Sequence, residues 1–184
     1  MLNDELRQMI RREVAKSWPE VAPELIEAQV LVESAGNPRA ESACGARGLL
    51  QIMPDTARGL GIDPNTLWDP AINLYAGITY LLRQFEHFGE IGQDYDRMNY
   101  ALAAYNGGRG YVNKALALAR AQCAPYTDAK RPPWLQWDIA GPFLLDRRCV
   151  VSGKHPDGAQ MLLYVARIRC THFQLTRGQS AQEA

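Results

Sequence analysis

The apolar residues of this chain recur at helical spacing in short stretches, and glycine or proline ends each stretch. The first stretch carries Leu2, Leu6, Ile10 and Val14 on one side, with charged residues opposite. This period predicts an amphipathic helix, because it places the apolar side chains on one face. Apolar and polar residues alternate only briefly, around residues 148–152, so we expect a mainly helical fold with little or no β-sheet.

Proline and acidic residues mark where further helices begin. Pro23 suits the first turn of a second helix, and Asp69 followed by Pro70 is a strong start for a long one. The expected helices cover about 23–36, 54–58, 70–89, 95–105, 112–119 and 161–168, and residues 39–48 form a loop. Residues 124–158 are rich in proline, tryptophan and glycine and show no clear pattern.

The length of 184 residues suits a single domain with a sizeable core. We expect an N-terminal helix and linker over 1–22, a compact domain over 23–176 and a polar tail over 177–184. Lys and Arg total 20, as do Asp and Glu, so the net charge of +0 argues against nucleic acid or an anionic membrane as partner. The chain is expected to act as a monomer.

Neither a transmembrane span nor a secretory signal is recognisable. The apolar runs, such as residues 143–145, are far shorter than the roughly 18 to 20 residues that cross a bilayer. The first 13 residues carry charge throughout and lack the apolar centre of a signal peptide. Either a signal has been removed or export follows another route.

The four cysteines, Cys44, Cys123, Cys149 and Cys170, are far apart and include no C-x-x-C pair. This spacing argues against a zinc ribbon or a thioredoxin-like redox site. Two disulfides, in any of three pairings, or four free thiols both fit the sequence. The three histidines show no ligand or triad spacing, so we expect no metal and no cofactor.

Glu33 is the candidate for catalytic chemistry. It follows Val30, Leu31 and Val32 at the end of an apolar helix, where partial burial and the negative end of the helix dipole are both expected to raise its pKa. A carboxylic acid that stays protonated near neutral pH can protonate the leaving oxygen of a glycosidic bond. A glutamate at a helix end is usually a solvated charge. The residues around Glu33 therefore decide whether it is a catalytic acid or an ordinary surface charge.

Those neighbours resemble the soluble lytic transglycosylase family over residues 24–118. The motifs are Glu33-Ser34-Ala35-Gly36-Asn37-Pro38, then Gly48-Leu49-Leu50-Gln51-Ile52-Met53-Pro54, then Asp69-Pro70 with Asn73, Gly77, Tyr80 and Leu81, and finally Ala103-Ala104-Tyr105-Asn106-Gly107-Gly108. Several motifs in this order are far more specific than any one alone. The resemblance implies a lysozyme-like fold, mainly helical with an active-site groove, and a transglycosylase catalytic domain over 23–176.

The resemblance also implies roles for individual residues. Ser34 is similar to the family serine that holds substrate or water beside the acid, although it can instead cap the helix end. Gln51 can offer a donor and an acceptor to sugar acetamido or hydroxyl groups. Tyr105 and Asn106, at a break between helix and loop, are expected to contact the sugar chain, and a buried tyrosine beside a turn asparagine is the alternative.

Tyr164 is similar to the late family tyrosine whose hydroxyl points toward the catalytic glutamate. The Glu-Thr pair that usually precedes that tyrosine is replaced here by Gln160-Met161, so a core tyrosine is an equal alternative. Trp134 and Trp137 can stack on sugars, but tryptophan beside proline more often anchors a loop to the core.

A mechanism with one carboxylate is preferred over one with two. Asp55 and Asp69 are better explained as residues at helix starts, and Glu41 as a solvated loop charge. Glu33 would then protonate the bridging oxygen, the substrate N-acetyl group would stabilise positive charge, and Glu33 would take the proton of the C6 hydroxyl. The resemblance implies a 1,6-anhydro-N-acetylmuramyl product from the β-1,4 bond to N-acetylglucosamine.

Two other functions remain open. A goose-type lysozyme hydrolyses the same bond with a similar fold, and a non-catalytic wall-binding or assembly module would retain the fold without cleaving. The expected partner in each case is peptidoglycan, reached in the periplasm or cell wall by a secreted, virion-associated or phage-released protein. We favour wall lysis or entry of the phage type.

Overall fold

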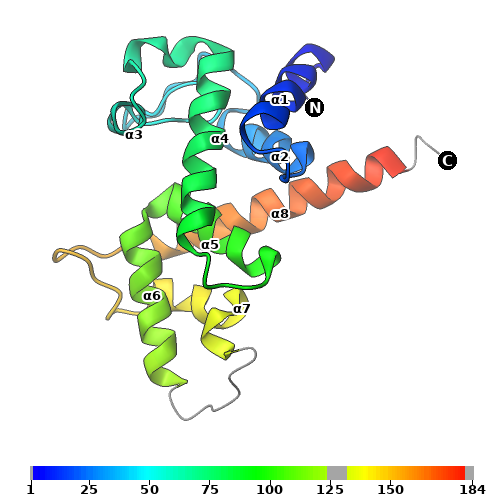
Figure 1. Cartoon of the computed structure of the whole chain (residues 1–184). Helices are drawn as coiled ribbons and strands as arrows, with labels where there is room; N and C mark the ends of the chain where they lie inside the picture. The colour runs from blue at the N-terminus through cyan, green and yellow to red at the C-terminus, as the bar shows by residue number, and fades with distance from the viewer. Residues whose placement is uncertain (1, 124–131, 181–184) are drawn as a thin grey trace. The chain divides into compact units, whose positions relative to one another are not determined.

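The computed structural model describes residues 2–123 and 132–180. These residues form eight α helices, three short 3₁₀ helices and only isolated β bridges (Figure 1), which confirms the mainly helical prediction. The α helices are α1 (Asp4–Ser17), α2 (Pro23–Ser34), α3 (Pro54–Gly59), α4 (Pro70–His87), α5 (Asp94–Gly107), α6 (Arg109–Gln122), α7 (Trp137–Ala140) and α8 (Gly158–Ser180). The 3₁₀ helices are η1 (Pro64–Trp68), η2 (Pro133–Leu135) and η3 (Gly141–Leu145).

The chain divides into two compact units. The first comprises Met1–Tyr80 with Arg167–Ala184, and the second comprises Leu81–Ala166. The boundaries fall inside α4 and α8, so each of these helices contributes to both units.

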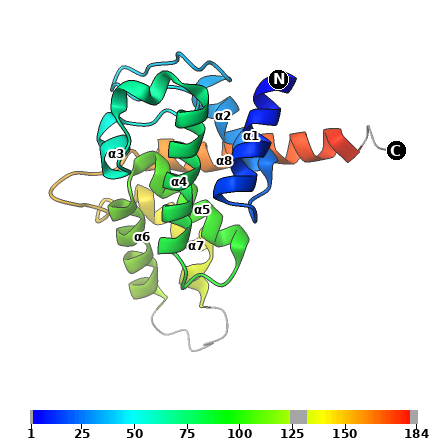
Figure 2. The ribbon, with the colours of Figure 1, turned by 45° about the horizontal axis from the view of Figure 1, so that its top comes forward.

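Helix α2 forms the centre of the first unit. Residues 25–30 are all buried, so this stretch of α2 is enclosed on every side. Helix α1 lies beside α2 in both views (Figures 1 and 2) and buries Ile10 and Val14, as its amphipathic pattern predicted. Complete enclosure requires apolar or paired side chains all round the helix, which explains the apolar composition of this segment.

A buried asparagine connects α4 to the loop that follows α2. Asn73 is 0% exposed, and its Nδ2 donates to the carbonyl oxygens of Arg47 at 2.8 Å and Leu67 at 2.9 Å. The backbone N–H of Leu50 donates to Asn73 Oδ1 at 2.8 Å. One amide therefore satisfies three backbone groups from two segments, which is close to its full capacity.

Gly48 allows this close approach. Its φ of +76° is a left-handed conformation that glycine adopts without strain. A Cβ at this position would collide with the Asn73 amide and would lie 2.7 Å from the Leu67 carbonyl oxygen. Glycine is thus required both by the backbone conformation and by the packing.

Charged side chains of α1 and α2 lie close together in the first unit, which also contains His172 of α8. Glu27 is 1% exposed, and its carboxylate lies 3.6 Å from Arg7 Nε and 4.0 Å from Arg11 Nε. Burial raises the pKa of Glu27, and the two arginines oppose this shift. Burial likewise lowers the pKa of His172, assisted by the positive charge of Arg169 and opposed by Glu24.

The second unit is built around α5. Its residues 98–104 are all buried, and α6 packs against α5 with Val112, Ala115, Leu116 and Ala119 inward, as expected from their spacing. Trp137 is 9% exposed and donates its backbone N–H to Asp96 Oδ1 at 3.0 Å. Its ring meets Tyr100 edge-on, with centroids 5.2 Å apart. Trp137 therefore has the anchoring role expected from its sequence context.

Some elements differ from the sequence-based expectation. The 3₁₀ helix η1 was not predicted, because its five residues are too few to show a period. Helix α8 continues to Ser180, four residues into the segment expected as a tail, while residues 124–131 and 181–184 lie outside the described residues. No helix in the described ranges has the length and hydropathy that a membrane span needs.

All four cysteines are free thiols. Cys149 is buried, and its Sγ donates to the Tyr111 carbonyl oxygen at 3.5 Å. Burial raises the pKa of the Cys149 thiol, so this residue is held in its unreactive protonated form.

Replacing Asn73 with alanine should lower the free energy of unfolding by about 3 kcal/mol, because the Leu50 N–H and the Leu67 carbonyl lose a buried partner and the Arg47 carbonyl keeps only the Ile52 N–H. Urea unfolding followed by circular dichroism measures this change. The exposed Asn65→Ala should change it by no more than about 0.5 kcal/mol. An Asn73→Ala protein as stable as the parent would contradict the bridging role of this amide.

Stability should also depend on His172. Its folded-state pKa lies below the unfolded value, so its contribution is present above about pH 6.5 and is lost as the pH falls through the folded-state pKa. His172→Gln should therefore lose less stability than the parent between pH 7.5 and pH 5 in urea titrations. The exposed His155→Gln serves as control and should follow the parent; identical pH profiles for all three proteins would refute this assignment.

Candidate active site

Glu33 lies in the last turn of α2, where the helix leaves the core. The buried residues 25–30 are followed by half-buried positions, and Glu33 is one of these. Ala35 ends the helix in a left-handed conformation with φ of 53°, and its N–H donates to the Leu31 carbonyl at 3.1 Å. The carboxyl is therefore attached near the negative end of the helix dipole, at the border between core and surface.

Ser34 connects this helix end to the next loop. Its Oγ lies 2.8 Å from the Leu49 carbonyl oxygen and 3.2 Å from the Val30 carbonyl oxygen. The Gly36 N–H donates to the same Oγ at 3.2 Å. The Ser34 hydroxyl thus bonds to the backbone on both sides of the helix end, and it holds Leu49 beside Glu33's own turn.

Gln51 lies two residues beyond Leu49 in the same loop. Its φ of 47° is left-handed, which is uncommon for a residue with a side chain. The Nε2 donates to the carbonyl oxygens of Ala40 at 3.0 Å and Gly48 at 2.9 Å, so the amide nitrogen is used within the loop. Oε1 takes no part in these two bonds. Strain of this kind is often found at functional sites.

The three alternative carboxylates have structural partners. Asp69 Oδ1 accepts from the N–H groups of Ala71 at 2.8 Å and Ile72 at 3.1 Å, which confirms it as a helix cap. Asp55 lies in the first turn of α3, as expected. Glu41 is an exposed loop charge, as expected, and its Oε1 lies 3.4 Å from Arg47 Nε.

Tyr105 and Asn106 are half-buried near the C-terminal end of α5 in the second unit. The next turn is tightly packed: a Cβ on Gly107 would collide with the side chain of Met161. Gly108 then ends the helix with φ of 101°, as its position in the sequence predicted. The end of α5 therefore packs against the first turn of α8.

Tyr164 lies one turn beyond Met161 on α8 and is 6% exposed. Positions three apart share a helix face, so Tyr164 is on the side of α8 that packs near the end of α5. The second unit thus groups Tyr164 with Tyr105 and Asn106, while the first unit groups Glu33 with Ser34 and Gln51. Within the described residues, no group of three or more His, Cys, Asp or Glu side chains is arranged to hold a metal.

Sequence reasoning quoted Asn73 only as part of a motif and gave it no role in the site. The structure shows that it holds the loop containing Leu50 and Gln51. No local pattern identifies such a residue, because two of its three partners lie 23 and 26 positions away in the sequence.

Comparisons with known proteins agree on one family. The family model described as "Transglycosylase SLT domain" matches residues 12–124. The transglycosylase of Enterobacteria phage PRD1 is 40% identical over 91 residues, which is 50% of this chain and 31% of that protein. Membrane-bound lytic murein transglycosylase F 2 of Alkalilimnicola ehrlichii is 32% identical over 161 residues, covering 85% of this chain and 34% of that protein.

A solved structure has the same fold. The 70 kDa soluble lytic transglycosylase SLT70 from Escherichia coli superposes with a TM-score of 0.60 at 24% identity, over 90% of this chain and 23% of that one. The chain thus spans about a third of the length of these two curated relatives and less of the solved structure.

Removing the Ser34 hydroxyl should destabilise the first unit. Ser34→Ala leaves the Leu49 carbonyl without its side-chain donor, so we expect the free energy of unfolding to fall by about 1 to 2 kcal/mol. Chemical unfolding measures the loss, with the exposed Ser152→Ala as matched control. Equal stability of the two variants would show that the bond to Leu49 contributes nothing.

Proposed function

Because the chain belongs to the transglycosylase SLT domain family, we propose that it cleaves peptidoglycan as a lytic transglycosylase. The bond cut is the β-1,4 link between N-acetylmuramic acid and N-acetylglucosamine, and Glu33 is the single acid and base. The observation that carries this proposal is the position of Glu33 at the half-buried end of α2, beside a loop held by Ser34.

In this reaction Glu33 first donates a proton to the substrate and then accepts another proton from it. The protonated Glu33 gives its proton to the bridging oxygen while the bond from C1 to that oxygen breaks. The acetamido oxygen of the same muramic residue stabilises the positive charge at C1. Glu33, now a carboxylate, takes the proton of the C6 hydroxyl, whose oxygen bonds to C1 and closes the 1,6-anhydro ring. The glutamate ends as it began, and no water is consumed.

The roles of the other acidic residues favour a mechanism that uses a single carboxylate. Asp69 caps α4 through Oδ1 and Glu41 pairs with Arg47 through Oε1, so each of these acids already has a structural role. An enzyme whose product forms by internal attack needs no hydrolytic water. This supports a lyase over an inverting muramidase.

The remaining site residues are proposed to bind the glycan. The two bonds of Gln51 Nε2 hold the amide in the loop and do not involve Oε1. Oε1 can therefore accept from a sugar hydroxyl or acetamido N–H. Tyr105 and Asn106, half-buried near the end of α5, offer a ring and an amide to the same strand. Tyr164 is proposed as a further residue that binds the glycan.

We further propose that the protein acts on the cell wall during phage-type lysis or entry, in virion-associated or phage-released form. The similarity to a phage transglycosylase supports this context. A secreted bacterial enzyme working in the periplasm fits the same chemistry.

Glu33→Gln should lower the rate of cleavage of purified sacculi by at least about 10³-fold, because the amide can neither give nor take the proton. Its unfolding midpoint should stay near that of the parent. Mass spectrometry of the released muropeptides should show anhydro ends, each lighter than a hydrolysed end by one water.

Three outcomes would contradict parts of this proposal. Full activity in Glu33→Gln would remove the glutamate from the mechanism. Hydrated muramic ends would indicate a goose-type muramidase. Wall binding without cleavage by the parent chain would indicate a binding or assembly module.

A further inference from the structure

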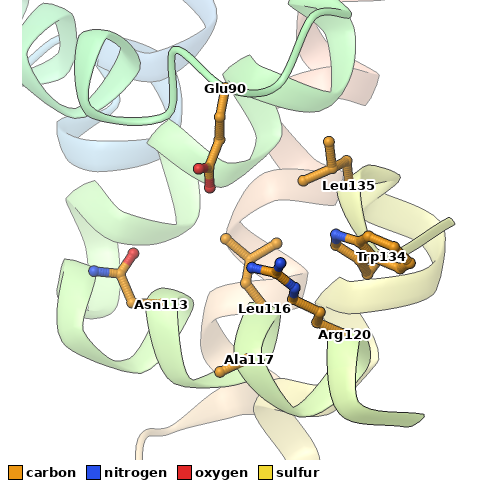
Figure 3. Close-up of a pocket in the computed structure, with 7 residues that line it drawn as sticks. All are labelled: Glu90, Asn113, Leu116, Ala117, Arg120, Trp134 and Leu135. Carbon is orange, nitrogen blue, oxygen red and sulfur yellow. The ribbon is translucent and has the colours of Figure 1, made fainter. Parts of the chain in front are cut away.

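The second unit contains a pocket whose lining includes none of the proposed site residues. It has a volume of ≈ 390 Å³ and lies along α6 and η2 (Figure 3). This volume falls within the usual range for pockets that hold small ligands, about 300 to 1,000 Å³. The pocket combines two opposite charges with a tryptophan and apolar side chains: Glu90, Arg120, Trp134, Leu116 and Leu135.

Glu90 and Arg120 face the pocket from different elements. Glu90 comes from the loop before α5 and extends its carboxylate into the space, while the Arg120 guanidinium enters from the last turns of α6 (Figure 3). Among the residues that the structure describes, no ion pair joins Glu90 to Arg120. Two opposite charges held apart across a pocket can each bind the opposite charge of one ligand.

The position of Arg120 is supported by Trp134. The guanidinium carbon lies 5.9 Å from the centroid of the indole ring, a cation–π arrangement that limits the freedom of the arginine. Leu116 and Leu135 supply the apolar surface between the charges. Asn113 lies on the opposite side of the pocket from Trp134, with its Nδ2 3.5 Å from His87 Nε2.

We propose that this pocket binds an amino-acid zwitterion: an ammonium and a carboxylate on one carbon at the end of an aliphatic chain. Arg120 would bind the carboxylate through its planar fork of donors, and Glu90 would bind the ammonium. The leucines would contact the aliphatic carbons. A neutral sugar would leave both charges without partners, so it fits this lining less well.

The inference rests on the proposed function, which supplies the source of this group. The stem peptides of many peptidoglycans contain meso-diaminopimelate, whose side chain ends in such a zwitterion. Helix α6 begins directly after the motif of Tyr105 and Asn106, and Leu116 lies seven residues beyond Arg109, or about 10 Å along the helix. A stem peptide that extends from a glycan bound at that motif can span this length.

Binding is tested without cleavage. The probes are the tripeptide L-Ala-γ-D-Glu-meso-diaminopimelate and its L-lysine counterpart, which keeps the side-chain ammonium but lacks the carboxylate beside it. NMR titration of the whole chain, following the indole N–H of Trp134, should give a Kd about tenfold lower for the first peptide. Arg120→Gln should abolish this preference, and Glu90→Gln should weaken both peptides about tenfold.

Exposed charges outside the pocket serve as matched controls. Lys114→Gln and Glu86→Gln should bind both peptides as the parent does. Equal affinity of the parent for the two peptides, failure to bind either, or an unchanged preference in Arg120→Gln would overturn the proposal.

A second measurement separates this inference from the proposed function. Arg120→Gln should lower kcat/KM about tenfold on strands that carry meso-diaminopimelate peptides, and should leave it unchanged on strands stripped of peptides by an amidase. An equal loss on both substrates would overturn the pocket's role. Absence of cleavage of either substrate by the parent would instead refute the transglycosylase proposal and leave the binding result standing.

Discussion

The hydrogen bonds of one buried side chain, Asn73, hold the loop on which the proposed active site depends. Its amide bonds to the backbone at Arg47, Leu50 and Leu67, and it is inaccessible to solvent. Buried backbone groups need partners, and Asn73 supplies them to the Leu50 N–H and the Leu67 carbonyl, while the Arg47 carbonyl also accepts from the Ile52 N–H across an isolated bridge. The amide of Asn73 thereby fixes the loop against η1.

Four of the proposed site residues, Glu33, Ser34, Tyr105 and Asn106, lie at helix ends that close on a residue with positive φ. Helix α2 ends at Ala35 with φ of 53°, directly after Glu33 and Ser34, and α5 ends at Gly108 with φ of 101°, shortly after Tyr105. Such an ending turns the backbone sharply away from the helix axis. Side chains of the last turn can then lie at the surface while the rest of the helix stays buried, which combines a rigid base with access to substrate.

Oppositely charged side chains are arranged differently in the two units. In the first unit, the buried Glu27 lies close to Arg7 and Arg11, and this proximity limits the cost of removing its carboxylate from water. In the second unit, Glu90 and Arg120 face one pocket without forming an ion pair with each other. The first arrangement serves the fold, whereas the second suits recognition of a ligand that carries both charges.

The sequence by itself determined most of the α helices, because their signals are local, but it did not indicate the short helices η1, η2, α7 and η3. Asp69 before Pro70 predicted the cap of α4, and the apolar period of α1 predicted its buried face. The motif around Glu33 also predicted a catalytic role that the family match supports but does not test. Only the tertiary structure decided the partners of Asn73 and the pocket between Glu90 and Arg120, which lie 30 positions apart in the sequence. Such pairings depend on how helices pack around a shared core, and the spacing of residues within one helix carries no information about them.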